Sequence, residues 1–252
     1  MMSINDIKLK LNDCKIEADY DAFVVEFAED SRASVAKLVD KAKQLKMALI
    51  AERERTEKMK EYEKKYADLG YIAGIDEVGR GPFAGPVVTC AVILPKDCDI
   101  LYLNDSKQLS EKKREELYDI IMEKAVSVSI AYRDHKRIDE INILAATLEA
   151  MKESVENLSV KPAVLLNDAV TIPGVDIKQV PIVKGDAKSI SIAAASIVAK
   201  VTRDRLMVKM DELYPGYDFA SNKGYGSKKH IEGLKNQGPC EIHRYSFIHN
   251  YI

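Results

Sequence analysis

The hydrophobic pattern at the start of the chain predicts helices. Between Ser31 and about Tyr66 there is no proline or glycine, and apolar residues recur in alternating steps of three and four: Val35, Leu38, Ala42, Leu45 and Leu49. This spacing forms one apolar seam along a helix. Beyond the seam, acids and bases alternate three or four residues apart, which is typical of a solvated helix face.

Two further signals extend the helical prediction toward the amino terminus. Ser3 followed by Asp6 indicates a helix start, and the segment Phe23–Phe27 supplies apolar side chains that the long helix could cover. Residues 1–68 are therefore predicted to form a small, mainly helical accessory domain.

From Gly70 onward, short apolar segments rich in β-branched residues alternate with helical patterns, which is typical of an α/β domain. This second domain is predicted to span residues 69–252. The pattern predicts strands over residues 71–75, 87–94, 126–132, 163–166 and 180–183, and helices over 110–124, 141–158 and 189–210. Small side chains at Ala193–Ser196 favour close packing of the last helix on the sheet.

Composition narrows the class of protein only slightly. The formal charge is -2, with 38 basic and 40 acidic residues, so any contact with nucleic acid must depend on local basic patches. The four scattered cysteines lack the spacing of a zinc site or a disulfide framework, which favours a reducing compartment. With no apolar leader and no stretch near the roughly 18 apolar residues of a membrane span, we expect a cytoplasmic protein without membrane contact.

Three apolar, strand-like segments are each followed by acids. Residues 71–75 precede Asp76 and Glu77, residues 163–166 precede Asp168 after one asparagine, and residues 180–183 precede Asp186. Because the carboxyl ends of neighbouring strands meet at one edge of an α/β sheet, these acids are expected to converge. Converging carboxylates repel one another, and a bound cation relieves that repulsion. All-oxygen ligation suits Mg²⁺ or Mn²⁺, whereas zinc prefers the histidine and cysteine clusters that this chain lacks.

Acids at strand ends also occur simply as solvated loop residues, so each segment alone is weak evidence. Asp105, Asp176 and Asp204 lie near other element boundaries and compete for the same role. Asp204 could instead pair with Lys200 one helical turn earlier. These three acids are interpreted as structural or supporting residues.

A glycine-rich segment, residues 79–86, follows the first acids directly. Its glycines would let the backbone approach a ligand, and Arg80 could reach a phosphate, although an ordinary hairpin loop explains the same composition. The spacing from Gly74 to Gly79 matches a Walker loop, but Arg80 and Gly81 replace the required Lys and Ser/Thr. Within residues 79–86, the glycine spacing is also one residue too long for a dinucleotide-binding fingerprint. We therefore expect no organic nucleotide cofactor.

Two other segments combine bases with loop-forming residues. Residues 105–107 contain Lys107 before a predicted helix, and residues 222–230 combine glycines, lysines and Tyr225 in one loop-like stretch. Such a mixture suits a phosphate contact with stacking, although most basic loops are simply solvated. His230 and His243 are weak signals, because a lone histidine is more often packed or capping than catalytic.

The chain resembles bacterial ribonuclease HII in long, ordered motifs. The matching segments are GIDEVGRGPFAGPVV, DSKQLS, KGDAKSISIAAASIVAKVTRDR and NKGYGSKKHI, and the resemblance covers about residues 70–247. It implies a ribonuclease H-like α/β fold, in which helices flank a mixed central sheet, with the helical appendage added at the amino terminus.

The resemblance also implies roles for individual residues. Asp76, Glu77, Asp168 and Asp186 would hold Mn²⁺ or Mg²⁺ ions. Gly79, Arg80 and Gly81 would contact the ribose 2′-OH, and Tyr225 would pack on the next sugar. The positions implied near backbone phosphates are Lys107, Lys184 and Ser227. Two residues depart from the usual family pattern: Ala169, where glycine is common, and Ser227, where threonine is common.

The implied activity is metal-dependent hydrolysis of the RNA strand in RNA–DNA hybrids, and nicking of duplex DNA 5′ of a single ribonucleotide. Its products would be a 5′-phosphate and a 3′-hydroxyl, formed with two metal ions. Two alternatives stay open: a ribonuclease HIII-like enzyme without junction preference, and a non-catalytic nucleic-acid-binding module. Protein partners are not indicated by the sequence.

Overall fold

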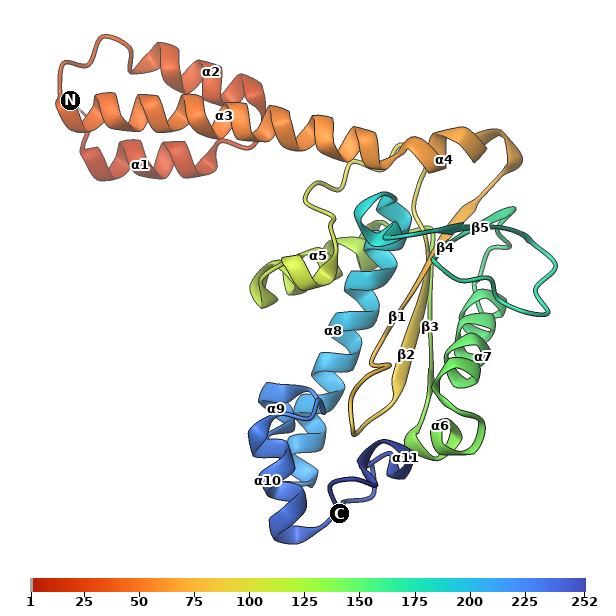
Figure 1. Ribbon diagram of the computed structural model, residues 1–252. Helices are drawn as coiled ribbons and strands as arrows, with labels where there is room; N and C mark the ends of the chain where they lie inside the picture. The colour runs from red at the N-terminus through yellow and green to blue at the C-terminus, as the bar shows by residue number, and fades with distance from the viewer. Residues whose placement is uncertain (1) are drawn as a thin grey trace. The chain divides into compact units, whose positions relative to one another are not determined.

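The computed structural model describes residues 2–252, which form two compact units divided between Lys58 and Met59. Figure 1 labels the helices and strands of both units. The domain boundary near residue 68, drawn from the change in composition, remains a prediction. Within residues 2–252, no helix is both long and apolar enough to cross a membrane.

The first unit is helical. It contains α1 (Ile4–Asp13), α2 (Glu17–Glu26) and most of α3 (Ala33–Met59). The Ser3 hydroxyl accepts a hydrogen bond from the Asp6 amide at 3.2 Å, so the predicted start of α1 is confirmed. The unit has its own buried apolar core, formed by Ile7, Leu11, Phe23, Phe27, Val35, Leu38, Val39 and Ala42.

The prediction of one continuous helix from Ser31 to Tyr66 with a single buried seam is wrong in two respects. The helix divides at Lys60, where φ of −88° and ψ of 6° leave the α conformation, and α4 (Glu61–Tyr66) begins at the next residue. A segment free of proline and glycine permits a long helix but does not enforce its continuity. Leu45, expected on the buried seam, is 36% exposed.

The second unit contains a five-stranded mixed sheet, which confirms the predicted fold class. Its strands are β1 (Ile72–Val78), β2 (Val87–Ile93), β3 (Ser127–Arg133), β4 (Val164–Asp168) and β5 (Lys178–Ile182). Their order across the sheet is β3-β2-β1-β4-β5. The first three strands pair in antiparallel fashion, while β1 pairs with β4, and β4 with β5, in parallel.

Helices cover both faces of this sheet (Figure 1). One face packs on α8 (Ile190–Leu213) and α5 (Glu111–Lys124), and the other on α7 (Ile143–Glu156). Successive side chains of β2 point to opposite faces of the sheet and so belong alternately to the two cores. Val88, Cys90 and Val92 belong to the core shared with α8, whereas Ala91 and Ile93 belong to the core shared with α7.

Helix α8 lies unusually close to β1. A Cβ added at Gly74 would stand 2.1 Å from the backbone carbonyl carbon of Ser191, so only glycine fits there. Ala193, Ala194 and Ala195 are fully buried on the same helix, as their small size predicted. The glycine that resembled part of a Walker loop therefore serves helix-to-sheet packing.

The remaining elements are short. They are η1 (Ala67–Leu69), η2 (Ser106–Gln108), α6 (His135–Ile141), η3 (Gly185–Ala187), α9 (Phe219–Asn222), α10 (Lys228–Gln237) and α11 (Tyr245–Ile248). The loop-like reading of residues 222–230 is wrong at both ends, because α9 includes Asn222 and α10 begins at Lys228. Ser227 caps this helix by accepting a hydrogen bond from the His230 amide at 3.2 Å.

Substitution Gly74→Ala is predicted to lower the free energy of unfolding by about 3 kcal/mol, because its Cβ must displace the backbone of α8. Gly238→Ala is the matched control: its φ is +75° and no atom lies within 4 Å of the added Cβ, so only about 1 kcal/mol of backbone strain is expected. Chemical denaturation of both variants measures the difference. Equal losses would show that α8 does not constrain Gly74.

Candidate active site

The structure brings the four predicted acids together at one edge of the sheet. Asp76 and Glu77 lie on β1, Asp168 is the last residue of β4, and Asp186 lies in η3 just beyond β5. β1 and β4 are parallel neighbours with Ile75 opposite Asn167, so the acids follow in adjacent positions. Asp168 Oδ1 accepts a hydrogen bond from the Gly185 amide at 2.8 Å, which ties β4 to η3.

The prediction that Asp76 and Glu77 follow the end of their strand is wrong. Both residues lie within β1. Pairing with β2 continues through Asp76 opposite Cys90 and Glu77 opposite Thr89. Backbone pairing with a distant strand extends β1 past its apolar segment, and this cannot be read from the local pattern. The consequence is a more rigid support for both carboxylates.

Asp76 is the most buried of these acids, at 6% exposure. Burial is the main cause that raises its pKa well above the ordinary value, and the charges of Glu77 and Asp168 raise it further. Hydrogen bonds from the Ser196 hydroxyl and the Glu77 amide act in the opposite direction. A buried carboxyl beside two others favours a site that is completed by positive charge.

Glu77 carries the clearest sign of a missing partner. Burial raises its pKa, Arg80 lowers it, and Asp168 raises it again. Arg80 donates to Oε1 at 3.3 Å, but Oε2 is buried and has no hydrogen-bond partner. A buried carboxylate oxygen without a partner costs free energy.

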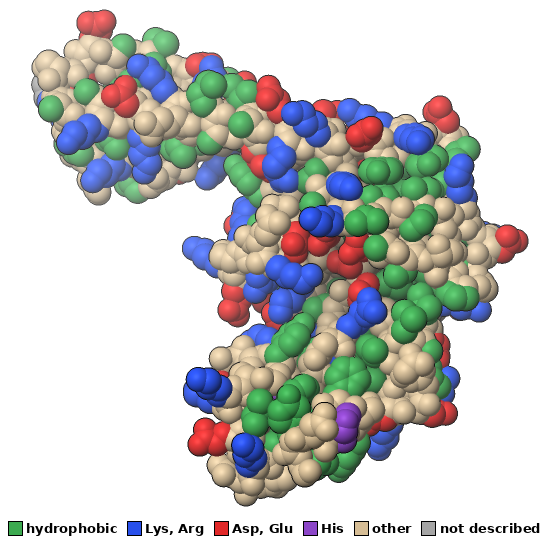
Figure 2. Space-filling model, in the orientation of Figure 1, with side chains coloured by type: hydrophobic (Ala, Val, Ile, Leu, Met, Phe, Trp, Pro, Cys, Tyr) green, Lys and Arg blue, Asp and Glu red, His purple; other side chains and the backbone are tan. Residues whose placement is uncertain are grey.

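Asp186 shares its surroundings with Asp105, which the sequence pattern predicts to be a structural or supporting acid. Its pKa is raised by burial first, then by the charges of Asp105 and Asp168, while Lys107 lowers it. Lys107 also lowers the pKa of Glu77, so it lies close enough to act on both acids. Figure 2 shows acidic side chains gathered among basic ones on the visible face of the second unit.

The donor chemistry of this cluster fits a hard divalent cation. All four side chains offer oxygen, the charge of Asp168 raises the pKa of each of the other three, and one buried oxygen lacks a partner. As the side chains stand, no three His, Cys, Asp or Glu residues within residues 2–252 form a finished ligand set. Binding of an ion would therefore require some of these carboxylate side chains to change conformation.

Ser196 and Ser106 support Asp76 from behind. Their hydroxyl oxygens are 3.0 Å apart and buried, which links α8 to the turn that carries Lys107. Asp105 Oδ1 accepts from the Lys107 amide at 2.9 Å, and Arg114 donates to the Ser106 carbonyl at 3.0 Å. Sequence reasoning noted Ser196 only for its size, since nothing local signals its hydrogen bond to a distant strand.

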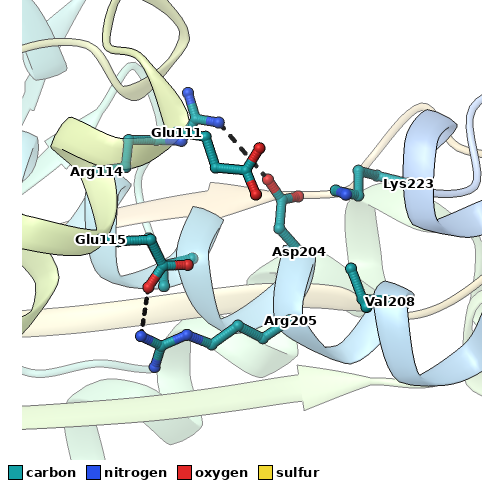
Figure 3. Close-up of a pocket in the computed structure, with 8 residues that line it drawn as sticks. Glu111, Arg114, Glu115, Asp204, Arg205, Val208 and Lys223 are labelled. Atoms are coloured by element: carbon teal, nitrogen blue, oxygen red, sulfur yellow. Dashed lines mark hydrogen bonds and ion pairs between the residues drawn. The ribbon is translucent and has the colours of Figure 1, made fainter.

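Acidic residues where α5 contacts α8 form ion pairs that stabilise this contact (Figure 3). Asp204 accepts a hydrogen bond from Lys200 at 2.7 Å, as predicted, and lies 3.9 Å from Arg114. Arg205 pairs with Glu115 in the same contact. The cavity they line has a volume of about 40 Å³, which is far too small for a nucleotide.

The glycine-rich segment and Tyr225 also meet. A Cβ added at Gly81 would lie 3.6 Å from Tyr225 Cε1, and the Tyr225 side chain is 45% exposed. Gly79 has a φ of +89° and is buried, whereas Arg80 and Gly81 are exposed. The solvent-accessible ring of Tyr225 therefore lies beside the accessible backbone of Gly81.

The two histidines form a buried hydrogen-bond chain that ends at Tyr225. The Cys240 amide donates to His243 Nδ1 at 2.9 Å, so His243 Nε2 carries its proton and donates to His230 Nε2, also at 2.9 Å. His230 Nδ1 then donates to the Tyr225 carbonyl at 2.9 Å. Burial lowers the pKa of His243 to about 4, so the pair stays neutral and packed.

Glu63 was not singled out in the sequence, yet it fixes the start of α8. Its Oε1 accepts from the Ser189 hydroxyl at 2.5 Å and from the Ser191 amide at 3.0 Å. The Ser189 amide in turn bonds the Gly185 carbonyl, which closes the turn around Asp186. Lys184 begins this turn with a φ of +56°, and its side chain is exposed.

Family models match both parts of the chain. The model described as ribonuclease HII matches residues 73–250, and the model described as the ribonuclease HII N-terminal domain matches residues 3–67.

Individual proteins give the same result. A ribonuclease HII of Lachnoclostridium phytofermentans is 66% identical over 224 residues, covering 89% of this chain and 88% of the relative. The Bacillus subtilis ribonuclease HII is 48% identical over 248 residues, covering 98% and 96%. The crystal structure of ribonuclease H2 from Pyrococcus horikoshii superposes with a TM-score of 0.60 at 30% identity, covering 70% of this chain and 93% of the other.

Proposed function

This chain belongs to the ribonuclease HII family and is a ribonuclease H hydrolase, and from that premise we propose that it nicks duplex DNA 5′ of single embedded ribonucleotides and cuts the RNA strand of RNA–DNA hybrids. The observation that carries the proposal is the convergence of four carboxylates from three separate segments, with Glu77 Oε2 buried and unpartnered. The same proposal assigns the enzyme to the cytoplasm.

Asp76, Glu77, Asp168 and Asp186 hold the metal in this proposal. These side chains would hold two Mg²⁺ or Mn²⁺ ions, which would supply activation of water and stabilisation of charge on the departing 3′ oxygen. The hydrogen bond from Ser196 orients Asp76, and the Gly185 amide orients Asp168. Hydrolysis then leaves a 5′-phosphate and a 3′-hydroxyl, with no covalent bond to the protein.

In this proposal the backbone of Gly79, Arg80 and Gly81 contacts the ribose 2′-OH, and Tyr225 packs on the adjoining sugar. The closeness of Gly81 to the Tyr225 ring, which would lie 3.6 Å from a Cβ added at Gly81, supports this shared role. Such a pair distinguishes an RNA-to-DNA junction from uniform DNA, which favours this function over a ribonuclease HIII-like one. Retention of all four acids disfavours a module that only binds nucleic acid.

Lys107, Lys184 and Ser227 bind backbone phosphates in the same proposal. The Ser227 oxygen already accepts from the His230 amide and the Asn222 side chain, so its own hydroxyl hydrogen remains available as a donor. It also stands at the N-terminus of α10, which favours anions. The helical N-terminal region is proposed to add duplex contact.

Asp76→Asn is predicted to reduce nicking of a duplex with one ribonucleotide by roughly 100-fold or more, because it removes one charge from the metal site. Binding of that duplex, measured by fluorescence anisotropy, should change little. Asp176→Asn is the matched control at an exposed acid outside the cluster and should retain activity. Wild-type-like turnover by Asp76→Asn would refute the assignment.

Tyr225→Ala is predicted to lower kcat/KM for a single embedded ribonucleotide about tenfold more than for a continuous hybrid, since one packing contact is lost at the junction. The control is Tyr132→Ala, which removes a tyrosine that is 65% exposed on β3. Gel assays of both substrates give the ratio. An equal loss on the two would remove Tyr225 from junction reading.

A further inference from the structure

Two arginines, Arg203 on α8 and Arg244 before α11, are fully buried. Neither forms an ion pair with any residue in the described part of the chain; burial lowers the pKa of Arg203 to about 10 and that of Arg244 to about 9. Burying a guanidinium without a carboxylate is expensive, and apolar residues of similar size would usually be more stable. Their presence therefore calls for a role that only guanidinium donors perform.

All their hydrogen bonds go to backbone carbonyl oxygens, and five of the six carbonyls belong to residues 79–86. Arg203 donates to Pro86 at 2.9 Å, Lys223 at 2.8 Å and Ala84 at 3.1 Å. Arg244 donates to Gly85 at 2.9 Å, Arg80 at 3.0 Å and Gly79 at 2.6 Å.

The contacts of Arg244 determine which way the adjacent amides point. In a trans peptide the C=O and N–H bonds are antiparallel, and the described residues contain no cis peptide. Because the carbonyls of Gly79 and Arg80 turn inward to Arg244, the amides of Arg80 and Gly81 turn outward. Both of these residues are exposed, and Gly81 adjoins the Tyr225 ring.

Arg203 completes the support from the other side. A Cβ added at Gly79 would lie 2.2 Å from Arg203 Nε, and one at Gly85 would lie 3.4 Å from its Nη2. The two glycines, with φ of +89° and +83°, are the residues that let the segment wrap this closely. The Arg244 amide also donates to the Phe83 carbonyl at 2.8 Å.

We propose that Arg244, backed by Arg203, is a positioning residue for ribonucleotide specificity: its guanidinium holds the carbonyls of Gly79 and Arg80 inward so that the amides of Arg80 and Gly81 face the ribose 2′-OH. This inference rests on the proposed function. A lysine offers no rigid fork for two carbonyls, so it cannot replace this arginine.

The test compares the affinities of the full-length chain for two duplexes of one sequence, one all-DNA and one with a single ribonucleotide, in Ca²⁺. Arg244→Met and Arg244→Lys are each expected to reduce the ratio of these affinities about tenfold while affinity for all-DNA duplex stays unchanged. A purely structural defect would weaken both affinities together. Arg137→Met, at an exposed ion pair on α6, is the matched control and should keep the wild-type ratio.

Circular dichroism establishes which variants fold; where Arg244→Met does not, Arg244→Lys, which retains the charge, carries the comparison. An unchanged ratio in the folded variant overturns the inference, as does a wild-type chain that nicks the ribonucleotide duplex but binds both duplexes alike. A wild-type chain that fails to nick in Mn²⁺ overturns the proposed function instead. The two failures are thus distinguishable.

Discussion

Repulsion between carboxylates held together at one edge of the sheet is the constraint on which the rest of the site depends. Asp76 is almost fully buried beside Glu77 and Asp168, and the pKa of Asp76 and Glu77 is raised mainly by burial. Folding must hold these groups in place against their mutual repulsion, and the unpartnered Glu77 Oε2 shows that protein donors alone do not compensate for it. A hard divalent cation is the natural complement.

Close packing and backbone pairing hold the carboxylates in place against their mutual repulsion. Gly74 lets α8 approach β1, and this approach brings Ser196 to Asp76. Glu63 fixes the first turn of α8 behind Asp186. The buried arginines support the neighbouring glycine-rich segment through its carbonyls, whereas Ser196 and the Gly185 amide support Asp76 and Asp168, so the exposed amides and these two carboxylates are held by different contacts. Changes in substrate selection and changes in metal binding should therefore be separable.

The pattern of apolar segments was sufficient to predict the α/β class, most strands and the convergence of the acids, because these follow from local periodicity and from the geometry of parallel strands. The full length of β1 was not predictable, since pairing with β2 extends it past Ile75. Lys228 was misassigned to a loop although Ser227 is a serviceable helix cap. Arg244 gave no signal at all, because its partners are backbone carbonyls more than 150 residues away in the sequence.

The most direct test of the central claim is anomalous diffraction from crystals of the full chain grown with Mn²⁺. The account predicts manganese peaks coordinated by side-chain oxygens of Asp76, Glu77, Asp168 and Asp186, with Glu77 Oε2 among the ligands. Manganese bound only elsewhere, or crystals saturated with Mn²⁺ in which these four carboxylates coordinate none, would contradict it.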